Sequence, residues 1–176
     1  GVMTVILPEN MINYTVFLDG ERLIGTANID LPSLDALTEK VKGAGIAGEV
    51  NAPVLGHYAE MKLTINWRTI TPYAAELARP VAHALDFRGS QQIYDSSAGA
   101  FRTVPVKIIV RAIPSKTSLG KMVVAGQTDT KNEFEANYIK IYVDGNEVVE
   151  IDKYNFIVRI AGDDILADVR ADLGLN

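Results

Sequence analysis

The stretch AEMKLTINWR (residues 59–68) decides the fold, because apolar and polar residues alternate along it. Its apolar positions are Met61, Leu63, Ile65 and Trp67. Successive side chains of a strand point to opposite faces of its sheet, so this period of two predicts a strand with one buried and one solvated face. Half-buried strands of this kind are typical of antiparallel sheets. We interpret Trp67 as a core residue and not as a platform for a ligand.

Similar strand signals occur along most of the chain and predict a mainly β fold. The alternation recurs at residues 104–111, and further runs rich in β-branched and aromatic residues lie at 13–18, 22–29, 81–94, 133–143, 147–151 and 156–160. Turn signals separate several of them, at Asp19-Gly20, at Asp144-Gly145 and at residues 96–99. Asp-Gly supplies the positive φ angles that tight hairpin turns require, so we expect hairpins there.

Two short helices are predicted beside the strands. The first follows Thr71, a good N-terminal capping residue, and Pro72, which suits the first helical position. It covers residues 73–79. Pro80 ends it, because proline lacks the N–H donor that a continuing helix needs.

The second predicted helix covers residues 164–173, with Asp163 as its N-terminal cap and Gly174 at its C-terminal end. Its apolar stripe consists of Ile165, Leu166, Val169 and Leu173. Such a stripe must be buried. We expect it to pack on its own chain, and packing against a neighbouring chain is the alternative.

The length of 176 residues fits one globular domain of ordinary size. We expect residues 13–176 to form this domain and residues 1–12 to form an N-terminal arm, in which Gly1 and Val2 are interpreted as a cloning remnant. Residues 40–57 and 113–131 show no clear pattern. Long loops are uncommon inside compact domains and tend to be functional, so both segments are candidates for contacts with other molecules.

Composition excludes several classes of function. Cysteine is absent, which excludes disulfides, thiol nucleophiles and cysteine-bound zinc. The net charge of −5 argues against a general affinity for nucleic acid. No apolar run approaches the ~20 residues that a membrane-spanning helix needs, so no membrane-embedded segment is expected. The first residues lack the pattern of a signal peptide, and we expect synthesis in the cytoplasm.

No catalytic constellation is found, so we expect neither an enzyme nor a bound cofactor or metal. His57 and His83 belong to no metal-binding spacing, and we interpret both as ordinary surface or hydrogen-bonded residues. Glu150 and Asp152 would share one face of a strand, which suits acid–base chemistry but equally describes a solvated strand face. We favour the second interpretation. The run GAGIAG (residues 43–48) has dinucleotide-loop spacing but lacks the required βαβ surroundings, so we interpret it as a loop.

Two blocks of sequence carry a family resemblance. The first contains FLDGERLIG (residues 17–25), LPSL (31–34) and GAG (43–45). The second contains YVDG (142–145), VEID (149–152), Asn155, Gly162-Asp163, Leu166, Arg170 and LGL (173–175). In this order and spacing, residues 13–175 resemble the major tail tube proteins of contractile-tailed phages and of R-type bacteriocins, which are headless phage tails. Between residues 74 and 131 the resemblance rests on strand order alone, and Ser33 and Pro80 depart from the family pattern.

The resemblance implies an antiparallel β-sandwich or barrel subunit with one or two short flanking helices. Six subunits would form a ring, rings would stack helically, and strands from all six would line one ring-wide β-barrel around a channel. The two long loops would supply contacts between subunits and rings. The residues expected there are Gly43, Gly45, Ile46, Gly48, His57, Gly120 and Gly126.

The partners that the resemblance implies belong to the tail of a phage or bacteriocin particle made in the cytoplasm of a bacterial host. They are further copies of the chain, the sheath, baseplate and tail terminator proteins, and a tape measure protein in the lumen. DNA, or only ions in a headless particle, would pass without sequence-specific binding. A ring of six copies would carry −30, six times −5, which suits a conduit that must not bind its cargo. Simple solubility explains the charge equally well.

The alternative function is a monomeric β-barrel module that binds carbohydrate or another protein. Such a module would need a discrete pocket with aromatic walls. Aromatic residues make up only 7% of the chain and are scattered along it, which favours the tail tube interpretation.

Overall fold

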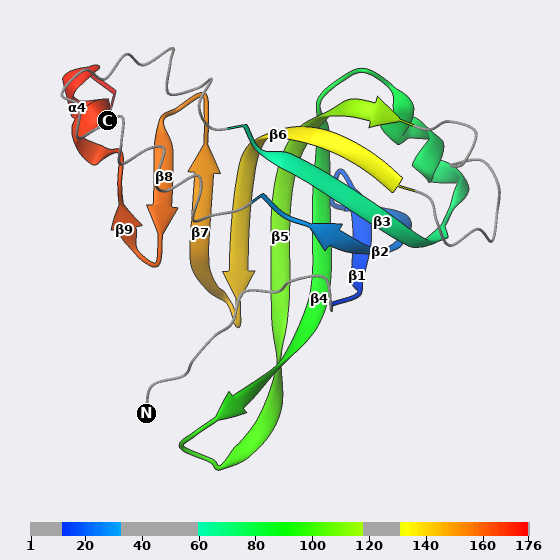
Figure 1. Ribbon diagram of the computed structural model, residues 1–176, viewed down its shortest axis with the longest axis horizontal. Coiled ribbons are helices and arrows are strands. Elements are labelled where there is room, and N and C mark those ends of the chain that lie inside the picture. Colours follow the sequence, from blue (N-terminus) through cyan, green and yellow to red (C-terminus); the bar gives the residue numbers. More distant parts are fainter. Residues whose placement is uncertain (1–11, 33–59, 118–130, 176) are drawn as a thin grey trace.

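The computed structural model describes residues 12–32, 60–117 and 131–175, which form one antiparallel sheet of nine strands with two short helices (Figure 1). The strands are β1 (Tyr14–Leu18), β2 (Arg22–Asp30), β3 (Lys62–Ile70), β4 (His83–Asp95), β5 (Ala100–Thr117), β6 (Lys131–Val143), β7 (Asn146–Asp152), β8 (Ile157–Ile160) and β9 (Asp163–Asp164). The helices are η1 (Pro72–Ala78) and α4 (Ala167–Asp172). The mainly β, antiparallel fold with flanking helices is confirmed.

Six of these strands close into a barrel. Their order is β3-β2-β1-β4-β5-β6, and β3 also pairs with β6, which closes the ring. β6 changes partner along its length, because residues 131–135 pair with β3 and residues 138–143 pair with β7. β7, β8 and β9 therefore continue the sheet outside the barrel, and we call these three strands the side sheet. Of the two architectures expected, the barrel is the one observed.

Alternating side chains fill the barrel, as the period of two predicts. Leu63, Ile65 and Trp67 of β3 are buried together with Phe87 of β4. Trp67 Nε1 donates a hydrogen bond of 2.6 Å to Asn132 Oδ1, which satisfies its one polar atom inside the core. Trp67 is thus a core residue, as expected.

Both Asp-Gly dipeptides lie in the turns of hairpins. Asp19 and Gly20, between β1 and β2, have φ angles of 55° and 75°. Asp144 and Gly145, between β6 and β7, have φ angles of 53° and 78°. Positive φ at both central residues gives the turn a twist that matches the twist of the strands. A third hairpin joins β4 to β5 through a turn that ends at Gly99, whose φ is 62°.

The segment expected to be a loop from residue 113 onward is partly strand, which corrects the prediction. β5 continues to Thr117, and β6 begins at Lys131. Pro114 lies beside a register shift and beyond the part of β5 that pairs with β4. Proline is tolerated in strands at edges and bulges, so it does not end β5 here.

The first predicted helix is observed as the 3-10 helix η1, which begins with Pro72. Arg79 leaves it in an extended conformation before Pro80, as expected. Thr71 occupies the N-cap position, as predicted, but its side chain makes no capping hydrogen bond. The Thr71 hydroxyl donates instead to the carbonyl oxygens of Leu23 at 2.7 Å and Ile24 at 3.0 Å, and so ties the start of η1 to β2.

The C-terminal helix is shorter than predicted, because its expected start is a strand. Asp163 and Asp164 form β9, which pairs with β8. Ala161 and Gly162, with φ angles of 50° and 88°, make the turn between these strands. α4 begins only at Ala167, so the prediction that Asp163 caps it is wrong.

The apolar stripe of this C-terminal segment is only partly buried. Leu166 and Val169 are buried within the chain, which confirms the expected packing for these two residues. Leu173 is exposed, so the prediction is wrong there. Gly174 has a φ of 72°, and Leu175 N donates to Arg170 O at 2.8 Å, which closes the end of the helix as predicted.

Candidate assembly surfaces

Strands β4 and β5 extend past the barrel as a two-stranded ribbon, seen at the lower end of Figure 1. We define the β4–β5 ribbon as residues 89–95 and 100–105. β1 pairs with β4 only at residues 85–88, and β6 pairs with β5 only from Val106 onward. In the described part of the chain, each ribbon strand therefore has one edge whose N–H and C=O groups face no other strand. Such edges are templates for pairing with another chain.

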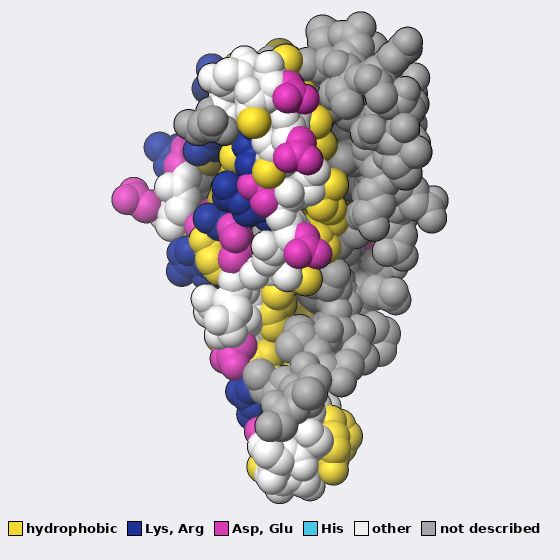
Figure 2. Space-filling model, turned by 90° about the vertical axis from the view of Figure 1, so that its left-hand side faces the viewer, with side chains coloured by type: hydrophobic (Ala, Val, Ile, Leu, Met, Phe, Trp, Pro, Cys, Tyr) yellow, Lys and Arg dark blue, Asp and Glu magenta, His cyan; other side chains and the backbone are white. Residues whose placement is uncertain are grey.

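The outer face of the ribbon ends in two exposed aromatic rings. Tyr94 and Phe101 lie opposite each other and are 52% and 67% exposed. Their ring centroids are 5.3 Å apart in an edge-to-face arrangement. Figure 2 shows hydrophobic side chains gathered at this lower end of the molecule. Exposed aromatic groups are enriched at the centres of protein–protein contacts, so the tip is a candidate contact.

Polar contacts hold the ribbon in shape. Asp95 Oδ1 accepts hydrogen bonds from Ser97 Oγ at 2.6 Å and Ser97 N at 3.0 Å. The hydroxyl bond is the main cause that lowers the pKa of the Asp95 carboxyl. Arg102 lies 3.6 Å from Asp95 and 3.2 Å from Asp144, and so ties the ribbon to the β6–β7 turn. An ordered projection loses less entropy on docking than a flexible one.

A second surface is the outer face of β6 and the side sheet, where basic and acidic side chains are interspersed (Figure 2). Its centre is Glu150 of β7, which is 8% exposed. Glu150 accepts a hydrogen bond from the Tyr138 hydroxyl at 2.8 Å and pairs with Arg159 at 2.6 Å and Lys140 at 3.7 Å. These contacts join β6, β7 and β8.

The same network decides the roles of Glu150 and Asp152. Burial, and next the bond to Glu150, raise the pKa of Tyr138 to about 12, so this phenol remains a hydrogen-bond donor. Asp152 accepts hydrogen bonds from the N–H groups of Tyr154 and Asn155 in the turn after β7. Both carboxylates therefore have structural contacts, and the description of Glu150 as a solvated residue is wrong.

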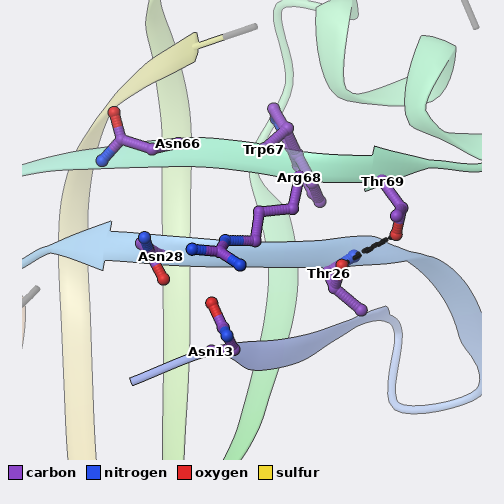
Figure 3. A pocket seen from close by; sticks show the side chains of 7 residues that line it. All are labelled: Asn13, Thr26, Asn28, Asn66, Trp67, Arg68 and Thr69. Atoms are coloured by element: carbon purple, nitrogen blue, oxygen red, sulfur yellow. Dashed lines mark hydrogen bonds between the residues drawn. The ribbon is translucent and has the colours of Figure 1, made fainter. Parts of the chain in front are cut away.

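A third surface is a pocket of about 740 Å³ on the outside of β1, β2 and β3, which we call the Arg68 pocket. Its lining residues are Asn13, Thr26, Asn28, Asn66, Trp67, Arg68 and Thr69 (Figure 3). The hydroxyls of Thr26 and Thr69 are hydrogen-bonded at 2.8 Å, and Asn66 Nδ2 donates to Asp30 Oδ2 at 3.0 Å. Three carboxamides, two hydroxyls and a guanidinium thus lie beside apolar surface in the lining.

Arg68 lies on the exposed face of β3, where the alternation with buried Ile65 and Trp67 places it, and a β-bulge is centred on it. Along consecutive residues of β2, the pairing skips from Thr69 to Trp67 of β3, so Arg68 is an extra residue without a partner. A bulge redirects side chains, and Figure 3 shows the Arg68 side chain lying across β2 toward Asn28. Within the described ranges, Arg68 takes part in no ion pair.

The residues predicted to contact other copies lie outside the described residues. They are Gly43, Gly45, Ile46, Gly48, His57, Gly120 and Gly126, and their role stays a prediction. The three surfaces found here were not predicted. The predicted strand at residues 81–94 and the turn signal at residues 96–99 are the features that could have shown the length of the ribbon, whereas the bulge at Arg68 has no local signal.

The remaining candidates for chemistry have ordinary contacts. His83 is buried, and its Nε2 lies 2.9 Å from Arg79 O, as expected for a hydrogen-bonded histidine. Among residues 12–32, 60–117 and 131–175, no group of three or more His, Cys, Asp or Glu is placed to hold a metal ion. No helix in these ranges is long and apolar enough to cross a membrane.

Almost the whole chain is similar in sequence to known proteins of one kind. The model of the family described as phage tail tube protein FII matches residues 8–174. The tail tube protein of Escherichia phage P2 is 29% identical over 178 residues, which cover 96% of this chain and 99% of the phage P2 protein. The match includes all nine strands and α4.

Proposed function

The chain belongs to the phage tail tube protein FII family, and from this premise we propose that it forms hexameric rings that stack helically into the inner tube of a contractile tail. Membership makes it a structural protein of the phage tail and not an enzyme. The match over residues 8–174 is the observation that carries the proposal, because it spans the complete sheet and not a single motif.

The open edges of the β4–β5 ribbon support assembly from further copies of the chain. Backbone groups without a partner favour pairing with a second chain, and contacts between different surfaces of successive copies close into rings or continue as filaments. In the proposed ring, strands of six subunits line one large barrel, and barrels with many strands leave an open channel. The loop residues Gly43, Gly45, Gly120 and Gly126 belong to the contacts of this proposal.

The proposed tube is a conduit and a rigid rod. A ring carries −30, six times the −5 of one chain, and this charge repels a polyanionic cargo from the walls. DNA, or only ions in a headless bacteriocin, passes through the lumen, which a tape measure protein occupies before release. Sheath, baseplate and tail terminator proteins are the remaining partners, and the subunits are made in the cytoplasm of the bacterial host.

The Arg68 pocket is the observation that favours the alternative, a monomeric binding module. Among its described lining residues the one aromatic is Trp67, whose ring is buried in the core and hydrogen-bonded to Asn132. No aromatic face among its lining residues is therefore available for a sugar to stack on. A carbohydrate module is the weaker proposal, and the pocket suits a charged protein group better.

Negative-stain microscopy and sedimentation of the purified chain test the proposal. We expect rings or long tubes that form above a threshold protein concentration and sediment rapidly. A sample that stays monomeric at high concentration would contradict the assembly and favour the binding module.

A further inference from the structure

The Arg68 pocket contains polar groups that lack partners inside the described part of the chain. Arg68 has an exposed side chain and no ion pair there, and its guanidinium presents five N–H donors. Asn28 Oδ1 is buried and accepts no hydrogen bond from any residue that the structure describes. A buried carbonyl oxygen without a donor costs free energy. The pocket is therefore an incomplete site that needs acceptors for Arg68 and a donor for Asn28.

An acidic peptide segment supplies both kinds of group. A carboxylate accepts two parallel hydrogen bonds from a guanidinium, a geometry that makes arginine the preferred residue for binding carboxylates. A peptide N–H or a side-chain donor of the same segment can satisfy Asn28 Oδ1. Asp30 of β2 is already bonded to Asn66. No ion pair within the described ranges supplies a carboxylate to Arg68, so a carboxylate of a second copy is a fitting partner.

Helix α4 carries carboxylates that match this need. Asp168 and Asp172 are four residues apart, so they lie on one side of the helix, and both are exposed. Neither forms an ion pair in the ranges that the structure describes. Like charges at this spacing repel each other, and an external cation would relieve the repulsion. Leu173, the next residue, is also exposed, and a contact at this end would bury it.

The two features lie apart in the molecule. Figure 1 shows α4 at one end of the longest axis, next to β8 and β9, whereas β1, β2 and β3, which carry the pocket, belong to the barrel. A contact between them joins successive copies head to tail, and such contacts close into rings when the rotation between copies allows. We propose that the Arg68 pocket binds Asp168 and Asp172 of a second copy. This inference rests on the proposed function and adds to it the surfaces that join neighbouring subunits.

A charge exchange on the full chain tests the pairing. Arg68→Glu places repulsion at one side of the contact, and the double substitution Asp168→Arg with Asp172→Arg places it at the other. We expect each variant alone to raise the threshold concentration for assembly by at least about tenfold. Mixed in equal amounts, the two variants should assemble again, because alternating copies restore opposite charges at every contact. A chain with all three substitutions should assemble by itself.

Matched variants make the result decisive. Lys62→Glu makes the same charge change on the same strand, at a side chain that is 79% exposed, and should assemble like the parent chain. Arg68→Lys keeps the charge but loses the two-point geometry, so it should assemble weakly. Circular dichroism and melting temperature establish that each variant is folded. All these surface substitutions should leave both measurements unchanged.

Two outcomes overturn the inference. If both one-sided variants assemble like the parent chain, Arg68 and α4 are not at the contact. If each fails to assemble but the mixture also fails, the pocket and the helix do not bind each other. In both cases the parent chain still forms tubes, so the proposed function stands. Failure of the parent chain to assemble would instead contradict the proposed function itself.

Discussion

The closed barrel and the β4–β5 ribbon share strands β4 and β5 but differ in what surrounds these strands. Inside the barrel, β4 has β1 on one side and β5 on the other, and Phe87 is fully buried against an edge-to-face partner, Tyr14. Past residue 88, the two strands have only each other, in the described part of the chain, and Phe101 is exposed.

This difference separates folding from assembly. Apolar burial is the main favourable contribution to folding, and it is concentrated where strands have neighbours on both sides. The two-stranded ribbon lacks a third strand, and its inner face is covered at Ile93 and Val104, which are buried. Its unpaired edges and aromatic tip are then available to another chain without loss to the barrel. The comparison predicts that substitutions in the two regions affect different measurements.

The largest effect is expected at Phe87. Phe87→Ala should lower the free energy of unfolding by about 3–5 kcal/mol, because it removes a buried ring and leaves a cavity in the barrel. Chemical denaturation of the isolated subunit measures this. Phe101→Ala is the matched control and should change the same quantity by less than about 1 kcal/mol. Equal losses from both substitutions would show that the ribbon folds as part of the barrel core.

The next effect is expected at Gly89, where β4 leaves the barrel. A Cβ at this position would lie 2.8 Å from Ile12 Cγ2 and 2.9 Å from Tyr14 Cδ1, and both neighbours are buried. Gly89→Ala should therefore cost about 1–3 kcal/mol of unfolding free energy through overpacking. Ser90→Ala, at the exposed adjacent position, is the control and should be nearly neutral. A neutral Gly89→Ala would mean that the junction can shift without disturbing the barrel.

The barrel is the part of the molecule that the sequence predicts best. Period-two alternation at Met61, Leu63, Ile65 and Trp67 correctly predicts which residues of this strand are buried. This prediction needs only the sequence of the strand itself and no knowledge of its neighbours. The two Asp-Gly turns are predictable for the same reason, because the dipeptide itself favours the positive φ angles of the turn. Closure of the ring through β3 and β6 was not predictable in this way, because the paired residues are about 70 positions apart in the chain, as for Leu63 and Phe134.

The parts that were missed depend on backbone geometry that no local pattern records. Ala161 adopts a positive φ beside Gly162, which turns the expected start of the C-terminal helix into β9. Pro114 is accepted within β5 because its position coincides with a register shift. Thr69 joins Arg68 on the exposed face because two distant strands pair out of step there. Each case is decided by tertiary contacts that override residue preferences.

A smaller effect on stability, but a clear one on assembly, is expected at the tip of the ribbon. Phe101→Ala should leave the subunit folded and raise the threshold concentration for assembly, because exposed aromatic residues often carry much of the binding energy of a contact. Thr103→Ala, on the same face of the ribbon, is the control and should assemble normally. Unchanged assembly of Phe101→Ala in sedimentation would remove the tip from the interface.

The smallest effect is expected at Asp95, and it is confined to the turn. The bonds from Ser97, chiefly the one from its hydroxyl, lower the pKa of Asp95 in the folded chain, so the charged carboxylate is the form that stabilises the turn. The charged carboxylate stabilises the turn fully above the ordinary aspartate pKa of about 3.9. This stabilisation is lost as the pH falls through the lowered pKa that Asp95 has in the folded chain.

The Ser97 amide reports this change directly. Its NMR shift should follow the titration of Asp95 as the pH falls from about 5 to about 2, and it should not follow it in Asp95→Asn. The amide of Phe87, in the barrel, should not respond to this titration, and the melting temperature of Asp95→Asn at neutral pH should match that of the parent chain. Because the ribbon has no described strand neighbour beyond its own two strands, a loosened turn breaks no strand pairing of the barrel. A drop in melting temperature caused by Asp95→Asn would show instead that the tip and the barrel unfold together, and the separation between folding and assembly would not hold.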